Sequence, residues 1–174
     1  MYTLDLIRDF HTHMQWADAE VWNAVSACDA AADDAAIRGL LFHIHFTQDA
    51  FCSVWEKREV VFREASAFAS LPPLYAWCRP IHQRIVAVVD ELDEDDLLTP
   101  NPLPWVKYFA RSRGKEAEMT TLGDTLAQLA MHSLYHRGQV NKRLRELGGE
   151  PPLVDYIAWI WMGRPAPAWG ATST

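Results

Sequence analysis

Long amphipathic segments constrain the fold of this chain more than any other feature of its sequence. From about Leu4 to Ala27, apolar side chains recur at alternating spacings of three and four residues, which is the period of one face of an α-helix. The same period runs through residues 37–55, 74–92 and 122–147. Four long helices, each with one apolar face, bury those faces best against one another. The sequence therefore predicts an all-α four-helix bundle.

Residues at the ends of these segments agree with helix boundaries. Asp33 or Asp34 can cap the second helix, and the prolines of "SLPPLYAW" suit the first turn of the third. Thr121 and Asp124 form a weak relative of a capping box before the fourth helix, and the glycines at 148–149 end it.

The remaining segments are shorter. We expect a solvated loop at "DELDEDDLLTPNPLP", a small hairpin within residues 105–121 before the fourth helix, and a short C-terminal helix in "LVDYIAWIW". A proline- and alanine-rich tail, residues 166–174, is expected to be loose. No internal repeat or phosphate-binding glycine loop interrupts the pattern, so residues 1–174 are expected to form a single domain.

Charge and cysteine content exclude several classes of protein. The formal net charge of −7 gives the chain no overall attraction to nucleic acid or to an anionic membrane. Cys28, Cys52 and Cys78 are widely spaced and form no CxxC motif, which is typical of free thiols in a reducing compartment. We see neither a signal peptide nor an apolar run of transmembrane length, and we expect a cytoplasmic protein.

The stretch "MHSLYHRGQV" holds two histidines four residues apart on the predicted fourth helix. Side chains at this spacing share one helical face, so His132 and His136 can offer two nitrogens to one metal ion. Buried imidazoles can instead be core residues that hydrogen-bond to neighbours. The pair alone does not decide between these two interpretations. Arg137 and Gln139 flank the pair, and we expect them to orient the bundle through polar contacts.

A third ligand would come from a neighbouring helix, and "LLFHIHFTQDAF" offers two histidines. His43 and His45 point roughly 200° apart on a helix and so cannot share a site. We favour His43, which lies in line with small and apolar residues, and expect His45 to face outward. His82 is expected to be a half-buried histidine with satisfied polar atoms, and His11 and His13 are expected to be structural or exposed.

These motifs resemble those of the DinB/YfiT-like superfamily, the damage-inducible DinB family of small metal-binding four-helix proteins. The likeness lies in "QWADAEVW" on the first helix, and in Leu40, Leu41, His43, Ile44 and Gln48 on the second. It continues in "HSLYHRGQ", "RLRELGGEPP" and "DYIAWIW", and so covers nearly the whole chain. Gln48 stands where a carboxylate is commoner, which places a carboxylate helper for the metal in doubt.

The resemblance implies a divalent metal ion held by His43, His132 and His136 at one end of the bundle. Three protein ligands leave an open coordination position, as in catalytic sites. We expect zinc or nickel, with iron as an alternative, because imidazole ligands do not choose among these metals. The alternative that His45 rather than His43 is the ligand stays open.

Relatives in this superfamily include enzymes that use low-molecular-weight thiols. The resemblance therefore implies a metal-dependent enzyme, a thiol-dependent transferase or isomerase, that acts on a small-molecule substrate. Two alternatives are a metal-dependent hydrolase and a metal-binding, stress-related protein without turnover. We expect a homodimer. Trp105, Trp159, Trp161 and Trp169 are expected to line a pocket or an interface.

Overall fold

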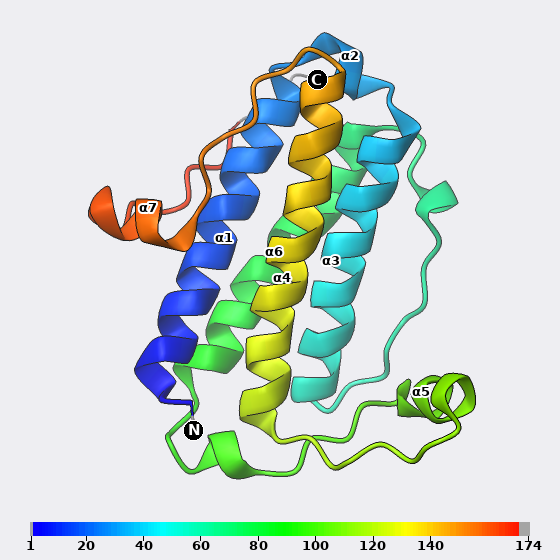
Figure 1. Cartoon of the computed structure of the whole chain (residues 1–174), viewed down its shortest axis with the longest axis vertical. Coiled ribbons are helices and arrows are strands. Elements are labelled where there is room, and N and C mark those ends of the chain that lie inside the picture. Colours follow the sequence, from blue (N-terminus) through cyan, green and yellow to red (C-terminus); the bar gives the residue numbers. More distant parts are fainter. Residues whose placement is uncertain (1, 171–174) are drawn as a thin grey trace.

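Four long helices run side by side along the molecule (Figure 1). The computed structural model describes residues 2–170. The long helices are α1 (Leu4–Ser26), α3 (Ala35–Trp55), α4 (Leu71–Asp90) and α6 (Leu122–Glu146). Shorter elements are α2 (Asp29–Ala32), α5 (Val106–Arg113), α7 (Tyr156–Trp161) and two 3₁₀ turns, Ala65–Ala67 and Asp96–Leu98. The prediction of an all-α four-helix bundle is confirmed.

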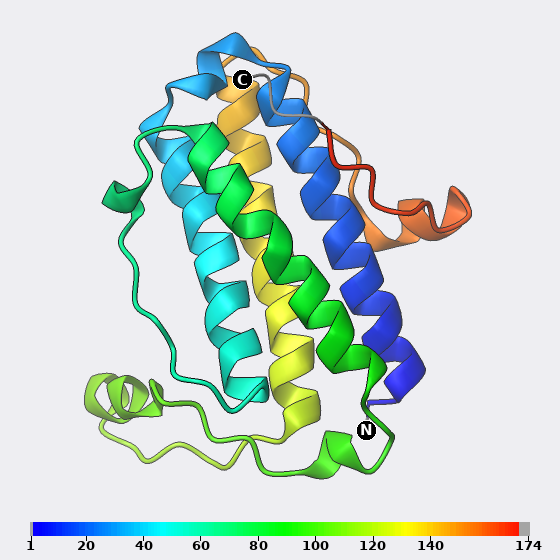
Figure 2. The ribbon, with the colours of Figure 1, turned by 180° about the vertical axis from the view of Figure 1, so that it is seen from behind.

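The four helices surround one apolar core. Helix α6 packs against α1 on one side and α3 on the other, and α4 closes the bundle behind them (Figures 1 and 2). The predicted apolar positions of α3, from Ile37 to Trp55, are buried. Among the described residues, no helix is both long and apolar enough to span a bilayer.

The helix ends follow the expected capping chemistry. The Asp34 side chain accepts a hydrogen bond from the Ile37 amide at 2.8 Å, which caps α3. Thr121 and Asp124 form a full capping box at the start of α6. Beyond the end of α6, Gly148 adopts a left-handed backbone with φ +81°, a conformation that suits glycine.

The small hairpin predicted within residues 105–121 is wrong. Residues 106–113 form helix α5, and an isolated bridge between Pro100 and Thr121 is the β-type pairing nearby. Trp105, Tyr108 and Phe109 are spaced by three and one, so they share a helical face instead of alternating as strand residues do. Arg111 and Arg113 lie in the last turn, and Gly114 ends the helix with φ +64°.

The C-terminal segment differs from the loose tail expected at residues 166–174. The Gly170 amide donates a hydrogen bond to the Asn23 side chain at 3.0 Å, and the Tyr75 hydroxyl donates one to the Gly170 carbonyl at 2.5 Å. The Trp169 ring lies 4.9 Å from the His82 ring. The segment up to Gly170 therefore packs along α1 and α4; residues 171–174 lie outside the described residues.

Candidate metal centre

Helices α3 and α6 bring three histidine side chains together. These helices are neighbours that run in opposite directions (Figure 1). His43 projects from α3 toward His132 and His136, which lie one turn apart on α6. The Nε2 atom of His43 is 3.2 Å from Nε2 of His132 and 3.2 Å from Nε2 of His136. We call these three residues the histidine cluster.

The spacing of the three nitrogens matches the dimensions of a metal site. Zinc–imidazole bonds are about 2.0–2.1 Å long, so two ligands at a tetrahedral angle hold their nitrogens about 3.3 Å apart. The structure gives 3.2 Å for both contacts of His43. An ion could thus be bound without a large movement of the rings.

The protonation of the cluster also favours a cation. Nδ1 of His136 lies 2.8 Å from Oε1 of Gln139, an acceptor, so Nδ1 carries the proton and Nε2 presents its lone pair. Burial, and then the neighbouring His136, lower the pKa of His43. Burial, His136 and His43 lower the pKa of His132 to about 4. At neutral pH the rings of His43 and His132 are therefore uncharged, and they can offer nitrogen lone pairs to an ion.

The His132 ring has a buried nitrogen without a partner in the described part of the chain. Nδ1 of His132 is buried and has no hydrogen-bond partner among the described residues. Such an atom costs about 1–3 kcal/mol when no partner is found. The orientation of the His132 ring therefore depends on packing and on the contact between its Nε2 and His43. The His136 ring, in contrast, is oriented by a hydrogen bond to Gln139.

The cluster is accessible from outside the bundle. His43 is exposed, and His132 and His136 are half-buried. Within the part of the chain that the structure describes, no carboxylate or thiol joins this group of possible ligands. Three protein ligands with solvent access are typical of catalytic metal sites rather than closed structural ones.

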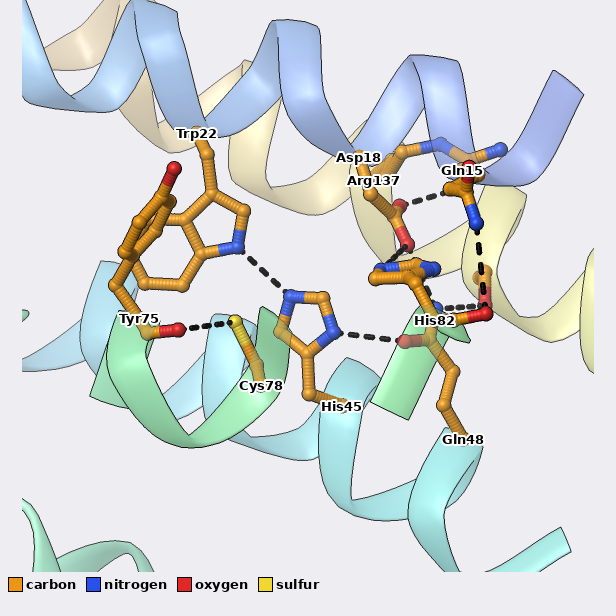
Figure 3. Close-up of polar contacts among 10 residues, drawn as sticks. Gln15, Asp18, Trp22, His45, Gln48, Tyr75, Cys78, His82 and Arg137 are labelled. Carbon is orange, nitrogen blue, oxygen red and sulfur yellow. Dashed lines mark hydrogen bonds and ion pairs between the residues drawn. The ribbon is translucent and has the colours of Figure 1, made fainter. Parts of the chain in front are cut away.

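His45 lies elsewhere, and the expectation that it faces outward is wrong. Its side chain is buried within the bundle, where Nε2 accepts a hydrogen bond from Trp22 Nε1 at 2.8 Å (Figure 3). Because the indole can only donate, Nδ1 of His45 carries the proton and donates to Gln48 Oε1 at 2.7 Å. The sequence did not reveal this burial, because His45 lies on the same helical face as Arg38 and Asp49, and charged residues are typical of an exposed face.

Gln48 connects His45 to a buried ion pair. Its amide nitrogen donates to Asp18 Oδ2 at 2.7 Å and to Ser133 Oγ at 3.1 Å. The other oxygen of Asp18 accepts a hydrogen bond from Arg137 at 2.7 Å, with both side chains 2% exposed. Burial is the largest single effect on the pKa of Asp18 and would raise it. The charge of Arg137, the nearby His82 and His45 and the Gln48 hydrogen bond together outweigh burial, so the pKa is lowered. Gln48 thus faces this network and not the histidine cluster.

Asp18, His45 and His82 lie close enough together to suggest a second metal site, since one possible ligand atom of each falls within 4.8 Å of the others. Two observations argue against it. Both nitrogens of His45 already make hydrogen bonds, and the Arg137 guanidinium would repel a cation beside Asp18. The network instead joins α1, α3 and α6, and so fixes the helices that carry the histidine cluster (Figure 3).

The other histidines are buried. His82 is 2% exposed rather than half-buried, and neither ring nitrogen makes a hydrogen bond to a described residue; Nε2 lies 3.4 Å from Asp18. Burial lowers the pKa of His82 to about 3. His11 and His13 place their Nε2 atoms 3.2 Å and 2.9 Å from the carbonyls of Leu126 and Val154. Of the two roles expected for His11 and His13, structural or exposed, the structure shows the structural one.

Arg137 was expected to orient the bundle through polar contacts, and it does so through Asp18, which we did not single out from the sequence. Two signals pointed to them: Gln48 lies on the apolar stripe of α3, and a buried amide needs polar partners from other helices. Asp18 belongs to "QWADAEVW" and Arg137 follows His136 directly, so both fall inside motifs already singled out. Charged residues next to a motif are more often solvated, and periodicity does not separate the two cases.

Comparison with known proteins adds one match. A family model described as the DinB family matches residues 1–169. No curated protein matches the sequence.

Proposed function

The chain belongs to the DinB family, and from this membership and the histidine cluster we propose that it is a divalent-metal-dependent protein in which His43, His132 and His136 hold the ion. The convergence of three imidazole rings, with Nε2 of His43 3.2 Å from Nε2 of both His132 and His136, carries the proposal. We propose zinc or nickel as the metal, with iron as an alternative, because the ligand set does not separate them.

A titration with Co²⁺ tests this proposal. Its visible d–d bands report coordination by protein ligands, and we expect them to saturate at about one ion per chain. His132→Ala and His136→Ala should each abolish the tight phase while the far-UV circular dichroism stays helical. Met131→Ala is the matched control, because Met131 lies on the same helix and is 53% exposed. Unchanged titration of the two histidine variants would refute the proposal.

For the activity, we propose a thiol-dependent transferase or isomerase that acts on a small molecule. When bound, a divalent ion supplies Lewis acidity and lowers the pKa of a thiol. The chain contributes the rest: Gln139 orients His136, and the solvent access of His43 leaves room for a thiol and an electrophile. In a substitution, a C–S bond forms, the leaving group departs with its electron pair, and the thiol proton goes to solvent.

The activity is tested with glutathione, bacillithiol, mycothiol and cysteine against one chromogenic electrophile. We expect one thiol to react faster with the metal-loaded protein, and a chelator or His136→Ala to return the rate to background. No acceleration by any of the four thiols would refute thiol transfer. Two alternatives would then remain: a metal-dependent hydrolase, and a metal-binding protein that has no turnover. The expected homodimer stays a prediction, which sedimentation velocity measures.

A further inference from the structure

An apolar cavity lies beside the histidine cluster. It has a volume of about 930 Å³, within the usual range for pockets that bind small molecules. Its walls come from the C-terminal half of α3, from α5 and from the segments around residues 60–62 and 115–120. Aromatic side chains dominate these walls: Phe46, Phe51, Phe62, Trp105, Tyr108 and Phe109.

The cavity is lined by residues of both α3 and α6 and reaches one member of the histidine cluster. His132 itself lines the cavity. Thr47, one turn after His43 on α3, and Gln128, one turn before His132 on α6, line it too. The cavity is therefore open to a molecule that contacts His132 at one end and α5 along its body.

The chemistry of the walls selects among ligands. The charged residues of the lining are Lys115, Glu116 and Glu118, which together carry no excess positive charge. Burying a charged or strongly polar molecule against aromatic walls would leave its polar groups without partners, which costs free energy. The low-molecular-weight thiols of the proposed reaction are molecules of that kind, so these walls do not suit them.

Of the four tryptophans expected to line a pocket or an interface, Trp105 lies in this cavity. Trp159 is buried, and its indole donates to the Pro165 carbonyl at 3.0 Å. Trp161 is 78% exposed on α7, and Trp169 packs on Tyr75. The aromatic wall therefore comes from the middle of the chain and not from its C-terminal end.

We infer that this cavity binds the apolar body of the substrate, an aromatic small molecule whose donor head group reaches the histidine cluster. The cavity is then the site of the electrophile, and the polar thiol approaches the cluster from the solvent side. This inference rests on the proposed function for the role of the head group, but the apolar binding itself does not require an ion.

Two hydroxamates that differ in their apolar part test the inference. Zinc-loaded protein should bind 2-naphthohydroxamate about 100-fold more tightly than acetohydroxamate, the gain expected when an aromatic ring system of this size leaves water. The double variant Phe62→Ser/Phe109→Ser removes two exposed wall residues and so leaves the core intact. It should lose most of this difference and keep the affinity for acetohydroxamate. Trp161→Ser, an exposed aromatic residue outside the lining, should behave as wild type.

A probe without a chelating group separates failure of this inference from failure of the metal proposal. The fluorescence of 2-naphthol should report binding to metal-free protein and to His136→Ala alike, and this binding should be lost in the double variant. If zinc does not bind but naphthol does, the metal proposal fails and the apolar cavity stands. If naphthol does not bind, or the two hydroxamates bind equally to the zinc form, the inference is overturned.

A different occupant would also be visible. If sedimentation shows a wild-type dimer that Phe62→Ser/Phe109→Ser converts to monomer, the aromatic wall is an interface between copies of the chain. That result would overturn the ligand inference, whereas a dimer unaffected by the double variant is compatible with it.

Discussion

Removing the positive charge of the buried ion pair should destabilise the fold strongly. In Arg137→Leu, the carboxylate of Asp18 keeps its contacts with Gln48 but loses its only cation at hydrogen-bonding distance among the described residues. With both side chains 2% exposed, solvent cannot replace the lost partner. Breaking a buried pair from one side costs about 3–5 kcal/mol. We expect the free energy of unfolding to fall by this amount at neutral pH.

The assay is urea unfolding followed by far-UV circular dichroism, with the double variant Asp18→Leu/Arg137→Leu as the key comparison. Replacing both partners by apolar residues removes the uncompensated charge, so the double variant should lose less stability than the sum of the two single variants. Lys142→Met is the control. It breaks an exposed contact of 3.9 Å with Glu146 and should leave stability unchanged. Additive effects of the two buried substitutions would refute the reasoning.

The same substitution should reverse the direction of the pKa shift of Asp18, and this changes how stability depends on pH. In the wild type the pKa of Asp18 is lowered, so its contribution is fully present above the unfolded value and is lost as pH falls through the folded value. In Arg137→Leu, burial loses its strongest opposing effect and should raise that pKa, so the folded state takes up a proton first. The stability gap between the two proteins should therefore narrow as pH falls from about 7 to about 5. A gap that stays constant would show that the lost free energy is packing and not charge.

Three further predictions concern the histidines. His43→Ala should weaken metal affinity by more than about tenfold in a chelator competition, while His45→Ala should change it by less than about threefold and lower the urea midpoint instead; the reverse order would contradict the site. Gln139→Ala should weaken metal affinity by about tenfold through loss of ring orientation, and an unchanged affinity would remove that role. The pKa of His82 is about 3 and that of His11 about 4, so stability of metal-free protein should fall as pH drops below about 6.5, where the unfolded chain takes up protons. His82→Leu should reduce that slope by up to about 1.4 kcal/mol per pH unit, and an unchanged slope would mean that His82 does not titrate between the two states.

The bundle was predictable because its signals are local and repeated. Each long helix carries an apolar stripe, and Asp34 and Thr121 mark helix starts through contacts within three residues. The juxtaposition of His43 with His132 and His136 was also predicted, because the i,i+4 pair shares a face and both the helical projection and the family resemblance favoured His43. The projection was wrong about burial, since His43 is exposed and His45 is buried. That these residues bind a metal stays a prediction.

What could not be predicted depends on contacts between distant segments. His45 is buried because Trp22 and Gln48 satisfy both of its nitrogens, and a helical projection of one segment does not contain that information. Helix α5 was mistaken for a hairpin because short aromatic segments suit either structure until packing decides. The cavity joins α3 to segments more than fifty residues away in sequence, so its aromatic residues could not be assigned to one surface.

Elemental analysis of untagged protein, purified without added metal, tests the central claim most directly. We expect about one equivalent of a single transition metal per chain in the wild type, the same in Met131→Ala, and almost none in the triple variant His43→Ala/His132→Ala/His136→Ala. Full occupancy in the triple variant, or no transition metal in a correctly folded wild type that also fails to take up Zn²⁺, Ni²⁺ or Fe²⁺, would contradict the account.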